Sequence, residues 1–135
     1  MPANTSPIFT LTPNVAWGDV ATANTAKDGT GTVVTVFTAG ANGARADSVL
    51  FRAKGTNVAT VARVFLNNGS TNATAANNVL IGEITLAATT LSEVAALAPY
   101  EIPINRVIPA GYKLNITIGT TVAAGYAASG WGGDY

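Results

Sequence analysis

The segment TVVTVFT, residues 32–38, is the clearest indication of the fold. Every residue in it except Phe37 is β-branched, and such side chains favour the pleated surface of a strand. Residues 39–43 follow with two glycines and an asparagine, which are typical of a turn. A second segment, residues 112–118, alternates polar and apolar residues with the period of a half-buried strand. These two segments predict a protein built from β-strands.

Further segments of strand length recur at intervals of about ten residues, separated by turn residues. Pro103 places one of them at a sheet edge, because proline cannot donate to a β-ladder. The stretch 91–97 is ambiguous: it predicts either one or two helical turns capped by Ser92 or a long irregular connection. We expect strands at residues 15–20, 32–38, 44–54, 59–66, 79–87, 100–105, 112–118 and 122–135.

About eight short strands without a helical period favour an all-β fold, a single-domain antiparallel sandwich of jelly-roll type. An immunoglobulin-like sandwich and an up-and-down barrel are the alternatives. The length of 135 residues suits one domain, which we place at residues 14–135. Prolines 2, 7 and 13 disfavour a helix before it, so residues 1–13 are expected to form an extended arm.

The composition excludes several classes of function. Seven basic and seven acidic residues cancel, which argues against an electrostatic nucleic-acid binder. No apolar run approaches the roughly 20 residues that cross a bilayer. The chain has no histidine and no cysteine, so these usual metal ligands and nucleophiles are lacking. The run Asp28–Gly31 predicts a turn rather than a calcium loop, and we expect no metal and no cofactor.

Carboxylates are the remaining candidates for catalysis. Glycoside hydrolysis needs two of them about 5 to 10 Å apart across a cleft. None of the seven lies in an aromatic-flanked pair, and most fall at predicted turns or strand ends. We therefore predict no catalytic residue and no enzyme, with a sugar-processing enzyme as the least favoured class. The acids are Asp19, Asp28, Asp47, Glu83, Glu93, Glu101 and Asp134.

Apolar and aromatic residues near the two ends are candidates for a protein interface. Ile8, Phe9 and Leu11 lie between prolines in the arm, where they are available to a neighbouring subunit. In the glycine-rich last segment, alternation places Tyr126 on one face and Trp131 on the other, and Trp131 fills either the core or an interface. The predicted interface residues are Ile8, Phe9, Leu11, Trp17 and Trp131. Stacking of these aromatics on sugars is the alternative.

Three segments carry a resemblance: residues 22–31, residues 109–114 (PAGYKL) and the end Gly132–Tyr135. They resemble small tailed-bacteriophage proteins encoded among virion structural genes. Stand-alone β-domains of this size in such phages are commonly capsid decoration, or cement, proteins. The resemblance implies a homotrimer on the capsid surface, made in the host cytoplasm and bound to the major capsid protein. A carbohydrate- or receptor-binding domain of a tail fibre or head spike is the alternative.

Overall fold

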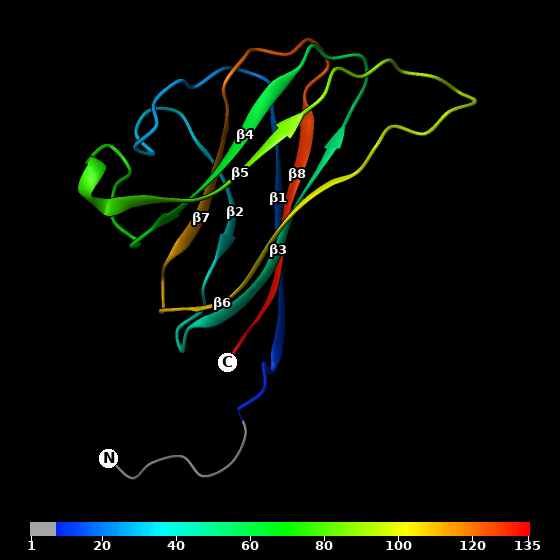
Figure 1. Ribbon diagram of the computed structural model, residues 1–135. Coiled ribbons are helices and arrows are strands. Elements are labelled where there is room, and N and C mark those ends of the chain that lie inside the picture. The colour runs from blue at the N-terminus through cyan, green and yellow to red at the C-terminus, as the bar shows by residue number, and fades with distance from the viewer. Residues whose placement is uncertain (1–7) are drawn as a thin grey trace, which may run out of the picture.

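The structure is a computed structural model that describes residues 8–135, so the first seven residues of the expected arm lie outside it. All the long elements of the chain are β-strands (Figure 1). In chain order, the elements are β1 (Thr12–Val20), β2 (Val34–Thr38), β3 (Ala44–Ala53), β4 (Thr60–Asn67), the 3₁₀ helix η1 (Ala75–Asn77), β5 (Asn78–Leu86), β6 (Tyr100–Ile108), β7 (Lys113–Ile118) and β8 (Tyr126–Asp134).

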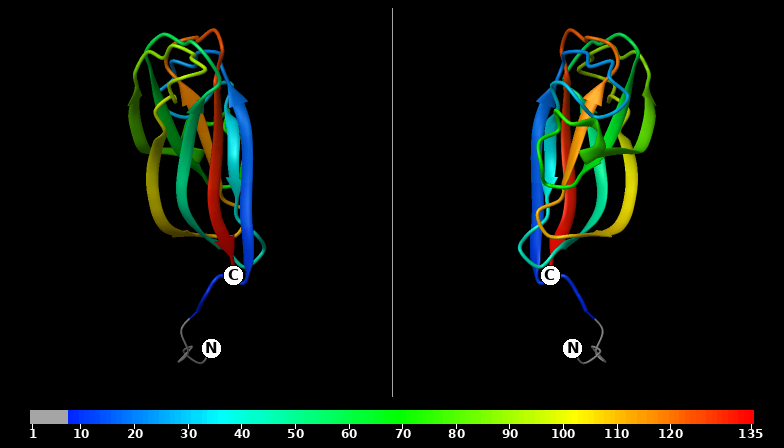
Figure 2. Two further views of the ribbon diagram at one scale, coloured as in Figure 1. Left: turned by 90° about the vertical axis from the view of Figure 1, so that its right-hand side faces the viewer. Right: turned by 90° about the vertical axis from the view of Figure 1, so that its left-hand side faces the viewer.

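The strands form two four-stranded antiparallel sheets packed face to face, with orders β1-β8-β3-β6 and β2-β7-β4-β5 (Figure 2). Early strands pair with late ones: β1 with β8, β2 with β7, β3 with β6, and β4 with β5. A double-sheet arrangement of this kind is a jelly roll. The predicted sandwich is therefore confirmed. The sheets do not close into a barrel, and the immunoglobulin strand order differs.

Several element boundaries differ from expectation: β6 continues to Ile108 rather than ending at residue 105, and β8 begins at Tyr126 rather than at residue 122. β1 begins at Thr12 rather than at residue 15, so it takes in the last two residues of the expected arm. Residues 91–97 form no helix; the Val94 amide donates to Ser92 Oγ at 3.1 Å within an irregular connection. As predicted, β6 with Pro103 lies at a sheet edge. Across residues 8–135, no helix has the length and hydropathy needed to cross a bilayer.

A β-bulge in β3 explains a pattern that the sequence left mixed. Ala46 pairs with Gly132 whereas Ser48 pairs with Trp131, so Asp47 is an extra residue in the ladder. A bulge shifts the alternation by one position. Ala46 before it and Val49 after it therefore both face the core. The mixed pattern of this strand therefore reflects a change of face at one residue.

The two sheets meet most closely where β8 crosses β2. A Cβ at Gly130 would collide with the carbonyl oxygen of Val36 in the facing sheet. A Cβ at Gly132 would collide with the carbonyl oxygen of Arg45 and lie 2.9 Å from the ring of Phe37. Glycine in a strand often marks the close approach of another backbone. The approaching backbone belongs to the same chain.

Two buried side-chain oxygens among the described residues have no hydrogen-bond partner, Thr117 Oγ1 and Tyr126 Oη. Tyr126 is fully buried in the core between the sheets. Burial raises the pKa of Tyr126, because the phenolate would lose its hydration, and Tyr100 nearby adds to the effect. An unpaired hydroxyl in such a place lowers the stability of the fold.

We predict that Tyr126→Phe raises the free energy of unfolding by about 1 kcal/mol, because it removes a buried polar atom without removing a hydrogen bond. Tyr100→Phe is the matched control. The Tyr100 hydroxyl accepts from the Ala87 amide at 3.3 Å, so its removal should have the opposite sign. Urea unfolding of both variants measures the difference, and a less stable Tyr126→Phe would contradict the prediction.

Asparagine side chains join the loops at the ends of the sandwich, and Asn57 is a buried example. Its Oδ1 accepts from the amides of Ala124 and Gly125 at 2.8 and 3.0 Å, and its Nδ2 donates to the Gly125 carbonyl at 3.0 Å. Its backbone also pairs with Thr89 in an isolated bridge. Asn57 thus connects the loop after β3 to the loop after β7 through its side chain and to the loop after β5 through its backbone.

Asn57→Ala should lower the free energy of unfolding by about 2 to 4 kcal/mol, because two amides lose their acceptor inside the protein. Asn42→Ala provides the comparison. Asn42 is exposed and makes one long bond, 3.4 Å to the Tyr135 carbonyl, so the change should stay within about 0.5 kcal/mol. Equal losses in the two variants, measured by urea unfolding, would argue against Asn57 as a structural connection.

Candidate interaction surface

The outer face of the sheet β1-β8-β3-β6 carries the two tryptophans of the chain. Trp17 is opposite Ser129, and Val15 is opposite Trp131. The tryptophans are therefore diagonal neighbours on paired strands, a separation of about 7–8 Å between backbones. Trp17 is 75% exposed and Trp131 45% exposed. The predicted alternation in β8 is confirmed, and Trp131 does not fill the core.

Sequence reasoning missed the residues that extend this face across β3 and β6. Leu50 pairs with Ser129 and is partly buried, and Val107 at the edge is exposed. Pro103 pairs with Ser48 beside Trp131. Simple alternation along β3 would place Val49 on the same face as Arg45 and Leu50 on the opposite face. The bulge at Asp47 reverses the alternation after that residue, so Leu50 shares the outer face with Arg45. We call Val15, Trp17, Leu50, Pro103, Val107 and Trp131 the tryptophan face.

The arm residues lie at one end of this face. The Leu11 amide donates to the Asp134 carbonyl at 2.8 Å, which continues the β1–β8 pairing by one residue. Leu11 is 82% exposed, and Ile8 and Phe9 are exposed too. Six residues of extended chain separate Leu11 from Trp17, about 20 Å. The structure brings Trp17 and Trp131 together and places the arm residues at the far end of the same strand.

The outer face of the other sheet is covered rather than bare. Phe65 points to that side, because Ala62 and Val64 face the core, yet Phe65 is fully buried. Two loops lie over this sheet, residues 21–33 and 68–77 (Figure 2). Asn72 Nδ2 connects them, donating to the carbonyls of Gly29 and Gly31 at 3.1 and 2.8 Å. The tryptophan face, by contrast, leaves Trp17 and Val107 well exposed to solvent.

Most carboxylates have structural partners. Asp19 pairs with Lys54 at 2.6 Å, Asp47 with Arg45 at 3.2 Å, and Glu83 with Arg63 at 3.7 Å. Asp134 Oδ1 accepts from the side chain of Asn14 and the amide of Gly40. No group of three or more carboxylates within residues 8–135 is placed to hold a metal ion.

Asp28 lies in a turn, as the sequence predicted. Its Oδ1 accepts from the Thr30 hydroxyl at 2.6 Å and the Thr30 amide at 3.1 Å. These bonds lower the pKa of Asp28, since they favour the charged carboxylate. Gly29 and Gly31 have positive φ values, 80° and 83°, that other residues rarely adopt. The Asp28–Gly31 segment is thus explained by turn geometry alone.

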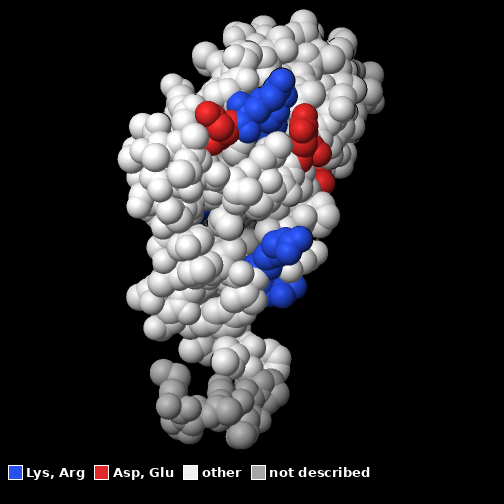
Figure 3. Space-filling view, turned by 60° about the vertical axis from the view of Figure 1, so that its left-hand side comes forward, with Lys and Arg blue, Asp and Glu red and all other residues white. Residues whose placement is uncertain are grey.

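Basic side chains do not form a continuous stripe. Figure 3 views the side of the sheet β2-β7-β4-β5 and shows basic side chains in separate groups, the upper one flanked by acidic side chains. Most of this surface is uncharged. Nucleic-acid binding depends on several basic groups aligned with phosphates, and this side offers no such alignment.

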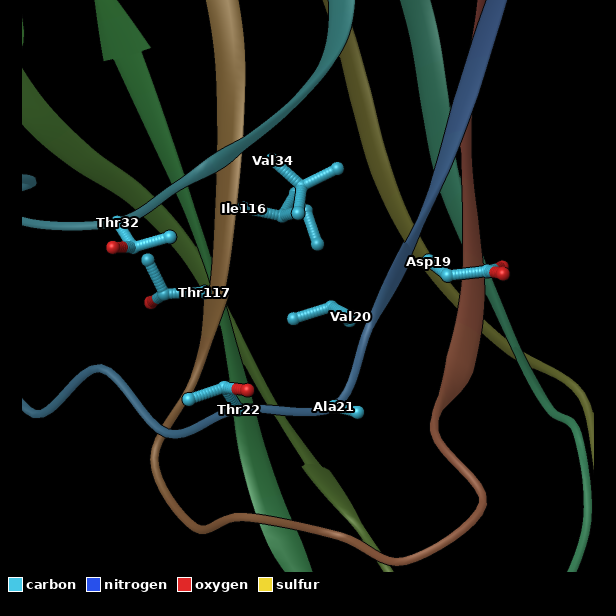
Figure 4. A pocket seen from close by; sticks show the side chains of 8 residues that line it. All are labelled: Asp19, Val20, Ala21, Thr22, Thr32, Val34, Ile116 and Thr117. Carbon is cyan, nitrogen blue, oxygen red and sulfur yellow. The ribbon is translucent and has the colours of Figure 1, made fainter.

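A cavity of about 120 Å³ opens between the ends of β1 and β2 (Figure 4). Val20, Val34 and Ile116 make it largely apolar, and the side chain of Asp19 points away from it. Thr117, with its unpartnered hydroxyl, lies at its margin. No acid or base faces the other lining groups, so the cavity offers no catalytic arrangement.

Comparisons with protein-family models, with curated proteins and with solved structures give no match for this chain. The surface itself offers an open apolar face with two tryptophans, the exposed Ile8, Phe9 and Leu11 at its end, and carboxylates that are mostly paired.

The tryptophan face predicts a fluorescence behaviour. Acrylamide should quench most of the emission of the folded protein, because Trp17 is in contact with solvent and Trp131 partly so. In Trp17→Phe the remaining emission should be quenched less steeply, since Trp131 is the less exposed of the two. Stern–Volmer titration measures both slopes. Slopes as low as those of a core tryptophan would contradict this description of the face.

Proposed function

We propose that this protein is a structural, non-enzymatic protein that binds other protein through the tryptophan face and the arm. We further propose that it is a capsid decoration protein, a homotrimer that attaches to the major capsid protein on the outer surface of a tailed-phage head and stabilises it. In this proposal the protein is made in the host cytoplasm and resides in the virion. The phage context comes from the resemblance of residues 22–31, 109–114 and 132–135.

The observation that supports protein binding is the open tryptophan face. Exposed contiguous apolar surface commonly marks an interaction site, and tryptophan is enriched where binding energy concentrates. The ion pairs Arg45–Asp47 and Lys54–Asp19 lie on the same sheet and leave little net charge around it. A near-neutral apolar patch is well suited to a dry contact with protein.

A carbohydrate- or receptor-binding role in a tail fibre or head spike is the second candidate. The diagonal placement of Trp17 and Trp131 favours it, because two exposed rings on one sheet face can stack on successive sugars. The two roles differ in what surrounds the rings. Sugar recognition needs polar groups beside them. Val15, Leu50 and Pro103 are apolar neighbours here, and the nearby hydroxyl of Ser129 already accepts from Trp131 Nε1 at 2.8 Å, which leaves Ser48 as the second polar neighbour.

The double variant Trp17→Ser/Trp131→Ser should bind phage heads that lack this protein about 100-fold or more weakly than the unchanged chain. Truncation of a tryptophan in an interface centre costs about 2 kcal/mol or more. Sedimentation of heads with bound protein measures attachment. Val94→Ser is the control: Val94 is exposed on the connection between β5 and β6, away from the tryptophan face, and attachment should be unchanged.

Equal attachment of the double variant and the unchanged chain would contradict the proposed use of the face. Urea unfolding of the double variant checks that the fold persists, since both rings project outward. A glycan array separates the second candidate: saturable binding to a glycan that both tryptophan substitutions abolish, without attachment to heads, would favour the carbohydrate role.

A further inference from the structure

Arg63 is unusual for a basic residue because its side chain is largely buried, at 12% exposure. It lies in the middle of β4 and pairs across the ladders with Glu83 and Thr117. Gly119 makes room for it. A Cβ at Gly119 would lie 3.3 Å from Nη1 of Arg63, so the absence of a side chain lets the guanidinium rest over the backbone of β7 and the turn after it.

The guanidinium lacks acceptors within the described part of the chain. Its nearest carboxylate is that of Glu83, with 3.7 Å between Nε and Oε1, which is beyond hydrogen-bond distance. No side-chain hydrogen bond among residues 8–135 involves Arg63. A guanidinium has five N–H donors in a rigid fork. Lys54, directly after β3 of the other sheet, by comparison bonds Asp19 at 2.6 Å.

An open groove of about 350 Å³ adjoins Arg63. Thr85 and Thr120 bring hydroxyls to it that make no hydrogen bond within the described residues. Thr60 also lines the groove, but its hydroxyl is occupied, accepting from the Thr120 amide at 2.9 Å. The groove thus gathers one guanidinium, which only donates, and two hydroxyls, each of which can donate one hydrogen bond. Its carboxylate is that of Glu83 at its side.

We propose that this groove is a binding site for a carboxylate group, held by the guanidinium of Arg63 and the hydroxyls of Thr85 and Thr120. A planar carboxylate accepts two parallel N–H bonds from the guanidinium fork. Glu83 already offsets part of the positive charge, which favours a singly charged group over phosphate. The carboxylate comes from an acidic side chain of a protein or from a small free acid. The site lies on the sheet opposite the tryptophan face and does not depend on the proposed function.

The test is a titration of the isotope-labelled full chain with sodium acetate, with sodium chloride added to keep ionic strength constant. The backbone amide signals of Gly119 and Thr120 should shift and saturate. In Arg63→Gln the affinity should fall by about tenfold or more, since the charged fork is lost. Arg45→Gln, which changes an exposed arginine on the other sheet, should bind acetate as the unchanged chain does.

Glu83→Gln sharpens the assignment. It removes the competing carboxylate, so acetate should bind several-fold more tightly if the ligand is an anion. Weaker acetate binding in Glu83→Gln would overturn the proposal. So would the absence of saturable shifts in the unchanged chain, equal shifts in Arg63→Gln, or tighter binding of inorganic phosphate than of acetate.

A pentaglutamate peptide distinguishes the two sources of the carboxylate. If the peptide binds more tightly than acetate at equal carboxylate concentration, and Arg63→Gln abolishes the difference, the site takes an acidic protein segment. If the two bind equally per carboxylate, it takes a small acid. Either result supports the site, and loss of attachment to phage heads has no bearing on it.

Discussion

The close contact between β8 and β2 is the constraint on which the sandwich depends. Gly130 lets the backbone of β8 meet that of Val36 in the facing sheet without an intervening side chain, and Gly132 leaves room for the ring of Phe37. On either side of that contact, Phe37, Phe51 and Tyr126 fill the interior. Because interiors are close-packed, this local approach sets the spacing that the larger side chains then fill. The direction of every outward residue in β8, Trp131 included, follows from it.

The outer faces of the two sheets differ in how far other parts of the chain cover them. Loops 21–33 and 68–77 cover much of one sheet and bury Phe65 against it, while the other sheet keeps Trp17 and Trp131 in solvent. A chain that can cover one apolar face but leaves a second open exposes a surface suited to another molecule. This asymmetry, rather than a reactive cluster, is the feature that a functional account must explain.

Much of the fold could be predicted because strand patterning is local. Alternation identified all eight strands and put Arg63 and Phe65 on the side opposite Ala62. Three features escaped it. The bulge at Asp47 arises from the pairing of β3 with β6 and β8. The burial of Phe65 arises from loops that are distant in the sequence. Among the residues that the structure describes, the guanidinium of Arg63 lies without a hydrogen-bond acceptor because it rests beside Gly119. Each depends on residues that lie far away in the sequence, which a local hydrophobic pattern cannot identify.

The sequence by itself determined that the protein is all-β with about eight strands, that Trp17 and Trp131 lie on strands, and that histidine and cysteine chemistry is excluded; the structure decided for a sandwich over a barrel. Only the tertiary structure decided which face stays bare, that the two tryptophans meet diagonally across β1 and β8, and that a guanidinium lies without an acceptor beside a groove. The reason is physical: a period of two assigns residues to a face, whereas exposure depends on what else in the chain packs against that face.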